Sequence, residues 1–414
     1  MDGKFFEELR DELTKDILPY WEKHACDREN GGFFGAIGND NKGDAGEWRG
    51  IVMVSRFLWS YSAAARFLGD RSYMAMADYA YDYMEKCFSD GRNGGLFWSV
   101  RPDGSPLVRR KQVYGNAFAL YALSEYAAAV REALGDEGRA RGIMAEAVRL
   151  FALLEDKARD PEHGGYWEAL AEDWTPTKET RLSDKDMDCD KSMNTNLHVM
   201  EAYTNLCRTL PLVCPEKKEE LARLRKALEA LVRVHADSIL DRRDWHLDLY
   251  FNRDWSRTGE DEISYGHDIE ASWLIWEAAE LLGGSELEDY VRPAVIAVAD
   301  TALREGWDAE SGGFEDKKEE DGTRRTVRVW WNQAEAINGF YNAWQMTGEE
   351  KYLTATEKVW GWVKAFQLDK EGGEWFQEVG RDGRPCPGLV KGGNWKTSYH
   401  NARCCMELLR RAGK

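Results

Sequence analysis

A short glycine-rich motif recurs along the chain and constrains its fold more than any other feature. Five copies place two adjacent glycines before an apolar or aromatic residue: Gly31-Gly32-Phe33, Gly94-Gly95-Leu96, Gly164-Gly165-Tyr166, Gly312-Gly313-Phe314 and Gly372-Gly373-Glu374-Trp375. Successive copies lie 60 to 70 residues apart, except for one longer gap that holds an aromatic equivalent without glycines around Trp245. Because each double glycine permits a tight turn before a short extended segment, the sequence indicates six copies of one unit.

Longer stretches with apolar residues at the 3.6-residue period flank each motif and predict two helices per unit. The twelve predicted helices span about residues 5–24, 51–69, 72–88, 113–134, 137–157, 189–210, 216–236, 265–283, 286–304, 330–347, 350–367 and 398–411. Connections within a pair are short, as at Thr347-Gly348-Glu349, which favours antiparallel neighbours. Connections between pairs are long and aromatic, and we expect them to form short β-hairpins.

Six antiparallel pairs at regular spacing predict an all-α fold, an (α/α)6 barrel of twelve helices in two concentric layers. We see no linker that would divide the chain, so we expect residues 1–414 to form a single catalytic domain. A solenoid of helical hairpins is the alternative, but the ends carry no distinct polar capping repeats. In a closed barrel the helices that follow the long loops run parallel, so their N-terminal ends share one rim. We expect any functional site at this rim.

Composition narrows the class of ligand. The chain has 414 residues and a formal net charge of −18, which argues against nucleic acid or an anionic membrane as a partner because both bind clustered Lys and Arg. No apolar run approaches the roughly 20 residues of a membrane span, and the start lacks the regions of a signal peptide, so we expect a cytoplasmic protein. Eight cysteines without a CxxC pair indicate reduced thiols. The 18 Trp and 17 Tyr fit a neutral small molecule such as a sugar.

The segment from Ser264 to Glu270 has the highest density of polar and titratable side chains on the rim. Ser264 is placed to cap a helix, so that His267 and Glu270 share one face of its start. Unpaired N–H groups and the helix dipole disfavour a positive charge there, which predicts a lowered pKa and a neutral imidazole. A lone histidine in this place would be interpreted as a capping residue. Three of the seven histidines, however, fall on the rim: His198, His267 and His400.

Two rim helices begin alike, with Ser264-Tyr265-Gly266-His267 in one and Ser398-Tyr399-His400 in the other. Two imidazoles at matching helix starts across a shared cavity would form an acid/base pair. Such a pair can remove a proton from one face of a carbon and deliver one to the other.

Other polar residues of the rim allow two interpretations. Arg56 lies in an apolar helix start, which favours a substrate contact over a salt bridge to a buried carboxylate. Asn194 and His198 are four residues apart on one helical face, where they contact either substrate or a polar network among helix ends.

The fifth rim helix carries adjacent tryptophans and an acidic residue. Only one of Trp330 and Trp331 can face the cavity squarely, so we expect the other in the core. Glu335 lies inside an apolar helix and needs a partner if it is buried; a structural ion pair with Arg56 or Arg328 is the alternative to a place in the site.

Four segments, taken together, resemble a known family. They are SYGHDIE at 264–270, RVWWNQAEA at 328–336, KSMNTNLHVMEAY at 191–203 and SYHNARCCME at 398–407. In this order they resemble the cellobiose 2-epimerases of the N-acylglucosamine 2-epimerase superfamily, and the similarity extends along nearly the whole chain. The resemblance implies the same (α/α)6 barrel.

The resemblance also assigns roles to individual residues. It implies that His267 and His400 are the acid/base catalysts and that Glu270 supports its histidine. The residues implied to line the sugar site are Arg56, Tyr114, Asn194, His198, Glu335 and Trp395, with Trp331 and Trp375 stacking on substrate. One departure is Gln112, where some relatives carry a histidine.

The implied reaction uses no cofactor and no metal. The sugar ring opens to its aldehyde, one histidine removes the C2 proton, Arg56 stabilises the enediolate, and the second histidine reprotonates the opposite face. Glucose at the reducing end of cellobiose or lactose becomes mannose, and a proton returned to C1 instead gives some ketose. We expect a monomer.

Four alternatives remain from the sequence. A mannose 2-epimerase or a monosaccharide aldose-ketose isomerase would use the same histidines. A metal-dependent isomerase could use His198, His267, Glu270 and His400 as ligands. A glycoside hydrolase would need opposed carboxylates, for which Glu270 and Glu335 are the candidates. A non-enzymatic sugar-binding module would need no catalytic histidine.

Overall fold

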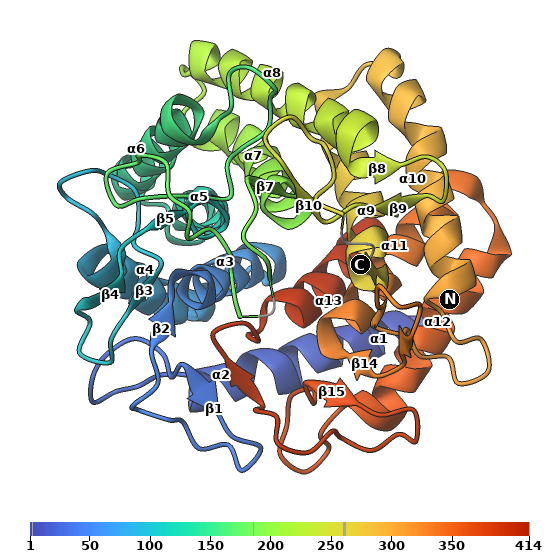
Figure 1. Ribbon diagram of the computed structural model, residues 1–414. Coiled ribbons are helices and arrows are strands. Elements are labelled where there is room, and N and C mark those ends of the chain that lie inside the picture. Colours follow the sequence, from blue (N-terminus) through green and yellow to red (C-terminus); the bar gives the residue numbers. More distant parts are fainter. Residues whose placement is uncertain (2, 185, 260–261, 414) are drawn as a thin grey trace.

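The computed structural model describes residues 1, 3–184, 186–259 and 262–413, and within them the chain forms twelve helical segments in two concentric layers (Figure 1). Each inner helix contacts both of its neighbours, including the last against the first, so the inner ring is closed. The structure confirms the predicted (α/α)6 barrel and excludes an open solenoid. The inner helices are α3 (Ile51–Leu68), α5 (Val113–Ala129), α7 (Met193–Val213), α9 (Tyr265–Leu282), α11 (Trp330–Thr347) and α13 (Tyr399–Arg411).

The outer layer is formed by the partner of each inner helix. Its helices are α1 (Gly3–Asp11) continued by η1 (Glu12–Ile17) and α2 (Leu18–His24); η2 (Arg71–Tyr73) with α4 (Met74–Phe88); α6 (Glu137–Leu153) with η4 (Leu154–Ala158); α8 (Lys218–Val234) with η5 (His235–Ile239); α10 (Ser285–Glu305); and α12 (Glu350–Trp362) with η6 (Val363–Gln367). A π-helical turn, η3 (Val130–Leu134), extends α5.

Burial separates the two layers. All 17 residues of α5 are buried, whereas α8 buries one stripe at intervals of three and four residues, namely Leu224, Ala227, Leu228, Leu231 and Val232. Among the described residues no helix combines the length and apolar character that crossing a membrane requires.

Short antiparallel strand pairs link the long loops around the ring. In each pair, a strand that leads into an inner helix meets a strand from a neighbouring unit. The pairs are β2 (Arg49–Gly50) with β3 (Ser99–Val100), β5 (Lys111–Gln112) with β6 (Ala169–Leu170), β7 (Lys191–Ser192) with β10 (Tyr250–Phe251), β11 (Ile263–Ser264) with β12 (Lys317–Lys318), β14 (Arg328–Val329) with β15 (Glu378–Val379), and β16 (Gly392–Gly393) with β1 (Ala36–Ile37).

Three further strands complete the hairpins: β4 (Pro106–Val108) beside β3, β13 (Arg324–Arg325) beside β12, and β8 (Leu240–Asp241) paired with β9 (His246–Leu247). One predicted boundary is wrong. The helix expected from residue 189 begins at Met193, because Lys191 and Ser192 pair with the neighbouring loop as strand β7.

A buried ion pair, which we call the loop clasp, fixes the loop of five units. In each clasp an aspartate just before the glycines binds a basic side chain that is wholly buried and lies in or beside the strand leading into the inner helix. The clasps are Asp27–Arg49, Asp90–Lys111, Asp160–Lys191, Asp308–Arg328 and Asp369–Lys391.

The fourth unit differs. Ile263 stands where the other strands carry the basic residue, and Asp268 of α9 instead accepts hydrogen bonds from the His246 Nδ1 (2.7 Å) and the Leu247 backbone N–H (2.9 Å). This is the unit that carries His267.

Candidate active site

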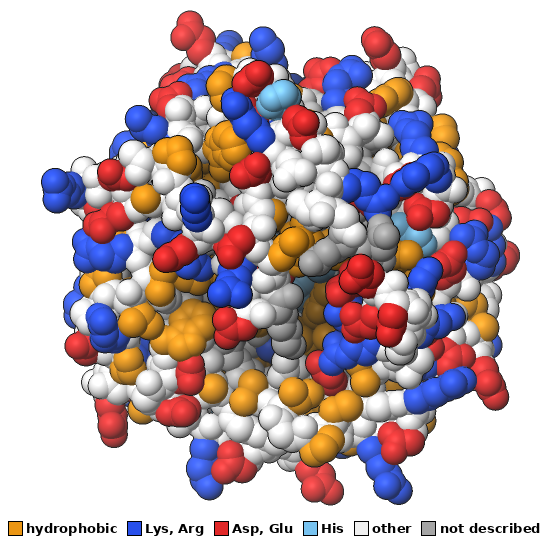
Figure 2. All heavy atoms as spheres, in the orientation of Figure 1, with side chains coloured by type: hydrophobic (Ala, Val, Ile, Leu, Met, Phe, Trp, Pro, Cys, Tyr) orange, Lys and Arg blue, Asp and Glu red, His pale blue; other side chains and the backbone are white. Residues whose placement is uncertain are grey.

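A cavity of about 460 Å³ opens at the rim, where the N-terminal ends of the inner helices meet; Figure 2 shows a hollow near the centre of this face. The closed ring brings together residues from all six inner helices and the loop before α13. Nine of the eleven expected site residues line the cavity: Arg56, Tyr114, Asn194, His198, His267, Glu270, Trp331, Trp395 and His400.

His267 lies in the first turn of α9 and binds its own helix start. Its Nδ1 is 2.7 Å from the Ser264 Oγ, and its ring lies against Trp331 with centroids 4.8 Å apart. Ser264 occupies the N-cap position but makes no capping bond with its side chain, because the hydroxyl is used by the imidazole. A side chain at Gly266 would place its Cβ 2.6 Å from the Trp331 ring, so only glycine permits this packing.

The charge state of His267 follows from its surroundings. Burial, with a smaller effect of His198, lowers the pKa of His267 to about 3. The imidazole is therefore neutral near pH 7, as expected from the sequence, although burial rather than the helix dipole is the main cause.

The expected contact between Glu270 and His267 is wrong. The Glu270 Oε1 accepts a hydrogen bond from an Arg403 guanidinium nitrogen at 2.7 Å, and the Nδ1 of His267 is bound to Ser264. A guanidinium offers the carboxylate a charged donor that a neutral imidazole cannot match. Burial, together with the nearby charge of Glu335, raises the pKa of Glu270 to about 8.

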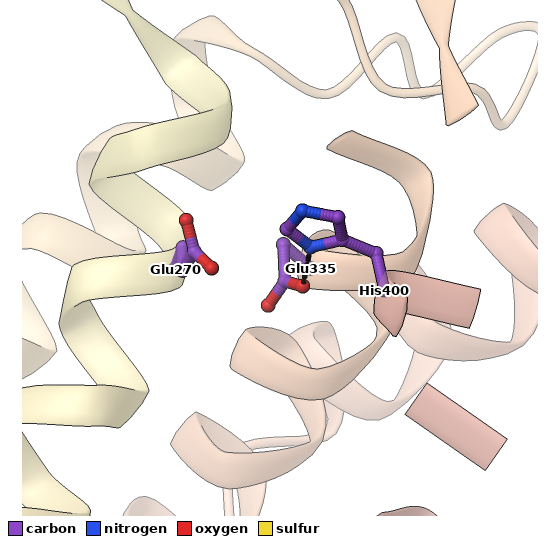
Figure 3. Close-up of side chains that lie close together, drawn as sticks. All are labelled: Glu270, Glu335 and His400. Carbon is purple, nitrogen blue, oxygen red and sulfur yellow. Dashed lines mark hydrogen bonds and ion pairs between the residues drawn. The ribbon is translucent and has the colours of Figure 1, made fainter. Parts of the chain in front are cut away.

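His400, in the first turn of α13, is held by a carboxylate from the neighbouring helix α11. Its Nδ1 is 2.7 Å from the Glu335 Oε1, the contact drawn as a dashed line in Figure 3. Glu335 lies behind the cavity lining, and its partners are His400, Arg403 at 2.7 Å and the Trp273 Nε1 at 3.0 Å, not Arg56 or Arg328. Burial, followed by the charges of Arg56 and Arg403, lowers the pKa of His400 well below its usual value.

His198 has the same kind of support. Its Nδ1 lies 2.8 Å from the Glu201 Oε2, one turn further along α7, and burial outweighs Glu201 to lower the pKa of His198. Where Nδ1–H donates to a carboxylate, Nε2 keeps its lone pair. The rings of His198 and His400 are thus set up to act as bases or hydrogen-bond acceptors.

Arg56 and Arg325 are the arginines of the cavity lining. Arg325 is paired with Asp316 and Glu378, so Arg56 is the one that can offer its charge to a ligand. Arg56 donates to the Trp395 carbonyl oxygen at 2.6 Å and to the Tyr114 Oη at 3.1 Å, and it lies over the Phe118 ring at 4.6 Å. Among the described residues it makes no ion pair, so its charge stays available to an anionic group. Across the cavity lining, the Asn194 Oδ1 is buried without a hydrogen-bond partner in the described part of the chain.

The expectation that Trp375 stacks on substrate is wrong. Trp375 is wholly buried, and its Nε1 donates to the Glu12 Oε1 at 2.8 Å. It occupies the same place in its loop as four core residues of other units, since each of them forms an isolated antiparallel bridge to a residue one or two positions after an outer helix: Phe33, Leu96, Tyr166 and Phe314. Trp375 therefore fixes a loop to the core, remote from the cavity.

One group of residues has the geometry to hold a cation. Ligand atoms of Glu270, Glu335 and His400 lie within 4.8 Å of one another, and the two carboxylates approach each other from different helices (Figure 3). The Arg403 guanidinium already bonds both carboxylates, so a metal ion would have to displace it. The four-residue ligand set considered from the sequence is not gathered: neither His198 nor His267 belongs to this group among the described residues.

Three buried residues behind the lining were not predicted: Glu201, Trp273 and Arg403. Each is a polar or indole group on an inner helix, three or four residues from a predicted site residue on the same helix, and so on its face. This spacing is the sequence signal that would have found them.

Comparison with known proteins shows similarity to one family along nearly the whole chain. The family model for N-acylglucosamine 2-epimerase matches residues 32–404. A cellobiose 2-epimerase from Bacteroides fragilis is 38% identical over 409 residues, covering 99% of this chain and 100% of its own. The structure of a cellobiose 2-epimerase from Spirochaeta thermophila superimposes with a TM-score of 0.88 at 40% identity, covering 99% of this chain and 97% of that one. Another, from Bacillus thermoamylovorans, gives a TM-score of 0.89 at 35% identity, with 99% and 100% covered.

The chain forms an (α/α)6 barrel with neutral histidines around a cavity that opens at one end. The family model and the relatives match it along nearly its whole length, and together these findings define a class of enzyme. The chain belongs to the N-acylglucosamine 2-epimerase family. It is a carbohydrate epimerase, and so an isomerase.

Proposed function

We propose that the protein epimerises C2 of the reducing-end glucose of β-1,4-linked disaccharides, converting cellobiose to 4-O-β-glucosyl-mannose and lactose to epilactose. Full-length relatives named cellobiose 2-epimerase, at 38% and 34% identity, support this substrate class. The cavity volume of about 460 Å³ lies in the usual range of small-molecule sites, about 300–1,000 Å³. Trp331 and Trp395 offer ring surfaces to the sugar.

The observation that carries the mechanism is a pair of neutral imidazoles that contact the same tryptophan ring in the cavity lining. His267 from α9 and His400 from α13 both lie against Trp331, with centroid distances of 4.8 and 5.6 Å. Both histidines line the same cavity, so a C2 carbon held between them would meet one imidazole on each face. In the open-chain aldehyde the C2–H bond is acidic, because the electron pair left by the proton is shared with the carbonyl.

Proton transfer then follows from these positions. One histidine takes the C2 proton through Nε2 and becomes an imidazolium, while the substrate becomes an enediolate. The guanidinium of Arg56 and the hydroxyl of Tyr114 stabilise the charge on its oxygens; burial raises the pKa of Tyr114, so this hydroxyl keeps its proton. After rotation about the C2–C3 bond, the other histidine, protonated by solvent water, donates this proton to the opposite face of C2, and the first histidine returns its proton to solvent. Return of a proton to C1 gives the ketose, so we expect some aldose-ketose isomerisation.

Glu270 has a role different from the one expected. It lines the cavity, and with a raised pKa it carries a proton near pH 7. We assign it as a hydrogen-bond donor to a sugar oxygen, rather than as the support of His267.

The positions of Glu270 and Glu335 argue against the alternative that the protein is a glycoside hydrolase. A glycoside hydrolase needs carboxyl groups about 5 Å or more apart on opposite sides of the scissile bond. Glu270 and Glu335 bind the same guanidinium nitrogen, so they lie side by side. A mannose 2-epimerase or a monosaccharide isomerase would use the same histidines, and only substrate preference separates it from our proposal.

The test is turnover of cellobiose, lactose and mannose in D2O, followed by NMR. We expect both disaccharides to give their 2-epimers with deuterium at C2. Free glucose without a 2-epimer would instead indicate hydrolysis, and turnover of mannose alone would favour the monosaccharide alternative. No reaction with any of the three sugars would favour a binding module.

A further inference from the structure

Arg403 occupies the centre of a buried network that connects four inner helices. It lies on α13, three residues after His400 and therefore on the same face, and only 1% of its surface is exposed. One terminal nitrogen donates to the Glu201 Oε1 and the Tyr399 Oη, and the other donates to Glu270 and Glu335, each at 2.7 Å. One guanidinium thus binds carboxyl groups from α7, α9 and α11.

Two of these glutamates also bind a histidine of the cavity: Glu335 binds His400, and Glu201 binds His198. The Oε1 of Glu335 is shared between Arg403 and the His400 Nδ1, while Glu201 uses Oε1 for Arg403 and Oε2 for the His198 Nδ1. Burial raises the pKa of Glu335, and the charge and hydrogen bond of Arg403 oppose this rise. Although burial opposes it, Arg403 lowers the pKa of Glu201 to about 2.

Arg403 acts from behind the substrate cavity. It does not line the cavity at the rim, but it lines a second cavity of about 240 Å³ together with Glu201 and Trp273. That cavity is bounded by the C-terminal halves of the inner helices, including Arg66 of α3 and Arg208 of α7. The Arg403 network is therefore the wall between the two ends of the barrel.

We propose that Arg403 is a positioning residue, which through Glu335 and Glu201 fixes the ring orientation and the tautomer of His400 and His198. The proposal rests on the proposed function, in which His400 transfers a proton at C2. Arg403 touches no substrate atom. It fixes the Oε1 of Glu335 so that His400 donates Nδ1–H to this oxygen and presents the Nε2 lone pair to the sugar.

The test separates positioning from simple stabilisation of the fold. In Arg403→Lys the charge remains, but one ammonium cannot bind three carboxylates in the geometry of the planar fork. We expect kcat about 10–100-fold lower with KM within about threefold, because the substrate contacts are unchanged. Glu201→Gln, a change of similar shape, should lower kcat less, since the cavity histidine that Glu201 contacts is His198 and not His400.

The matched control is Arg328→Lys. Arg328 is equally buried and binds Asp308 in a loop clasp, with no contact to a histidine of the cavity. We expect it to reduce thermal stability but to leave kcat and the pH profile unchanged. If Arg403→Lys behaved like this control, the positioning role would be wrong.

A second readout needs no substrate. The 15N shifts of the imidazoles report which ring nitrogen carries the proton. In the wild type we expect Nδ1–H for His400 and His198, and in Arg403→Lys a mixture of tautomers for both. Wild-type shifts in Arg403→Lys and in Glu201→Gln would overturn the proposal, whereas absence of epimerase activity in the wild type would overturn the proposed function alone.

Discussion

The two helix starts that look most alike in the sequence differ in one residue, and the difference separates the two proposed catalytic histidines. Gly266 makes the spacing from Ser264 to His267 three residues, which places both on one helical face. The spacing from Ser398 to His400 is two residues, which places them on different faces. The Ser264 Oγ accordingly binds the His267 Nδ1, whereas the Ser398 Oγ has no hydrogen-bond partner among the described residues.

His400 instead finds its partner on another helix, and that partner is charged. A carboxylate behind an imidazole stabilises the imidazolium that forms when Nε2 accepts a proton, and a neutral hydroxyl does so far less. The two bases are therefore unequal in their support: His400, backed by Glu335, is the better proton acceptor, and His267, backed by the hydroxyl of Ser264, is the better donor once protonated. The following predictions test this inequality.

The largest effects are expected from His267→Asn and His400→Asn. Each should lower epimerisation at least ~100-fold, because each removes one of two acid/base groups. The remaining histidine can still exchange the C2 proton on its own face. In D2O, we expect each variant to exchange C2–H in only one of the two epimers, and the two variants to exchange opposite epimers.

NMR of cellobiose and of its 2-epimer, incubated separately with each variant, reads this exchange directly. Exchange of both epimers by a single variant would mean that one base serves both faces. Near wild-type epimerisation by either variant would contradict the two-histidine mechanism.

Glu335→Gln should have the next largest effect. It keeps the shape of the side chain but removes the charge behind His400, and hydrogen bonds to charged groups contribute about 1.5–3 kcal/mol, or roughly 10–100-fold in rate. Steady-state kinetics should show the loss in kcat. The exchange attributed to His400 should slow in parallel, while that attributed to His267 changes less; equal slowing of both would remove the distinction between the two bases.

The pH profile of kcat/KM should have an acid limb set by the two histidines and an alkaline limb set by Glu270. Both histidines have lowered pKa values, mainly through burial, so the acid limb of kcat/KM should lie below the usual histidine pKa of about 6.5. Glu270 is protonated below its pKa of about 8. As the pH rises through that value, Glu270 loses the proton it donates and adds a negative charge beside Glu335, so activity should fall.

Glu270→Gln keeps a hydrogen-bond donor that does not titrate. Its alkaline limb should disappear while its acid limb stays, in a profile of kcat/KM measured on cellobiose. An alkaline limb that remains near pH 8 in this variant would assign that limb to another group.

Most of the fold could be predicted from the sequence because the chain consists of repeats of one helical unit. Five of the six units carry the same glycine turn and all six carry the same helix periodicity. Counting the units therefore predicts a closed ring, and the ring predicts which residues meet at the rim. Nine of the eleven expected residues do line the cavity.

Partners across helices could not be predicted in the same way. Glu335 binds His400 and Arg403, and Glu270 binds Arg403. These contacts form because α9, α11 and α13 are neighbours in the ring, so that the buried guanidinium can reach both carboxyl groups. Sequence spacing defines the face of one helix but not the rotation of its neighbour. Trp375 is different: its place in the repeat, matching Phe33 and Phe314, already indicated the core.

The smallest effect is expected from Ser264→Ala. A neutral hydrogen bond contributes about 0.5–1.5 kcal/mol, so kcat should fall only roughly two- to tenfold. The ring of His267 should also become more mobile, because Trp331 is then its main contact. The matched control is Ser398→Ala, which removes a hydroxyl from the corresponding helix start without removing a bond to a histidine. If the two alanine variants were equally active, the hydroxyl of Ser264 would not orient His267. If Ser264→Ala lost as much activity as Glu335→Gln, the two bases would depend equally on their partners, and the charge behind His400 would not distinguish them.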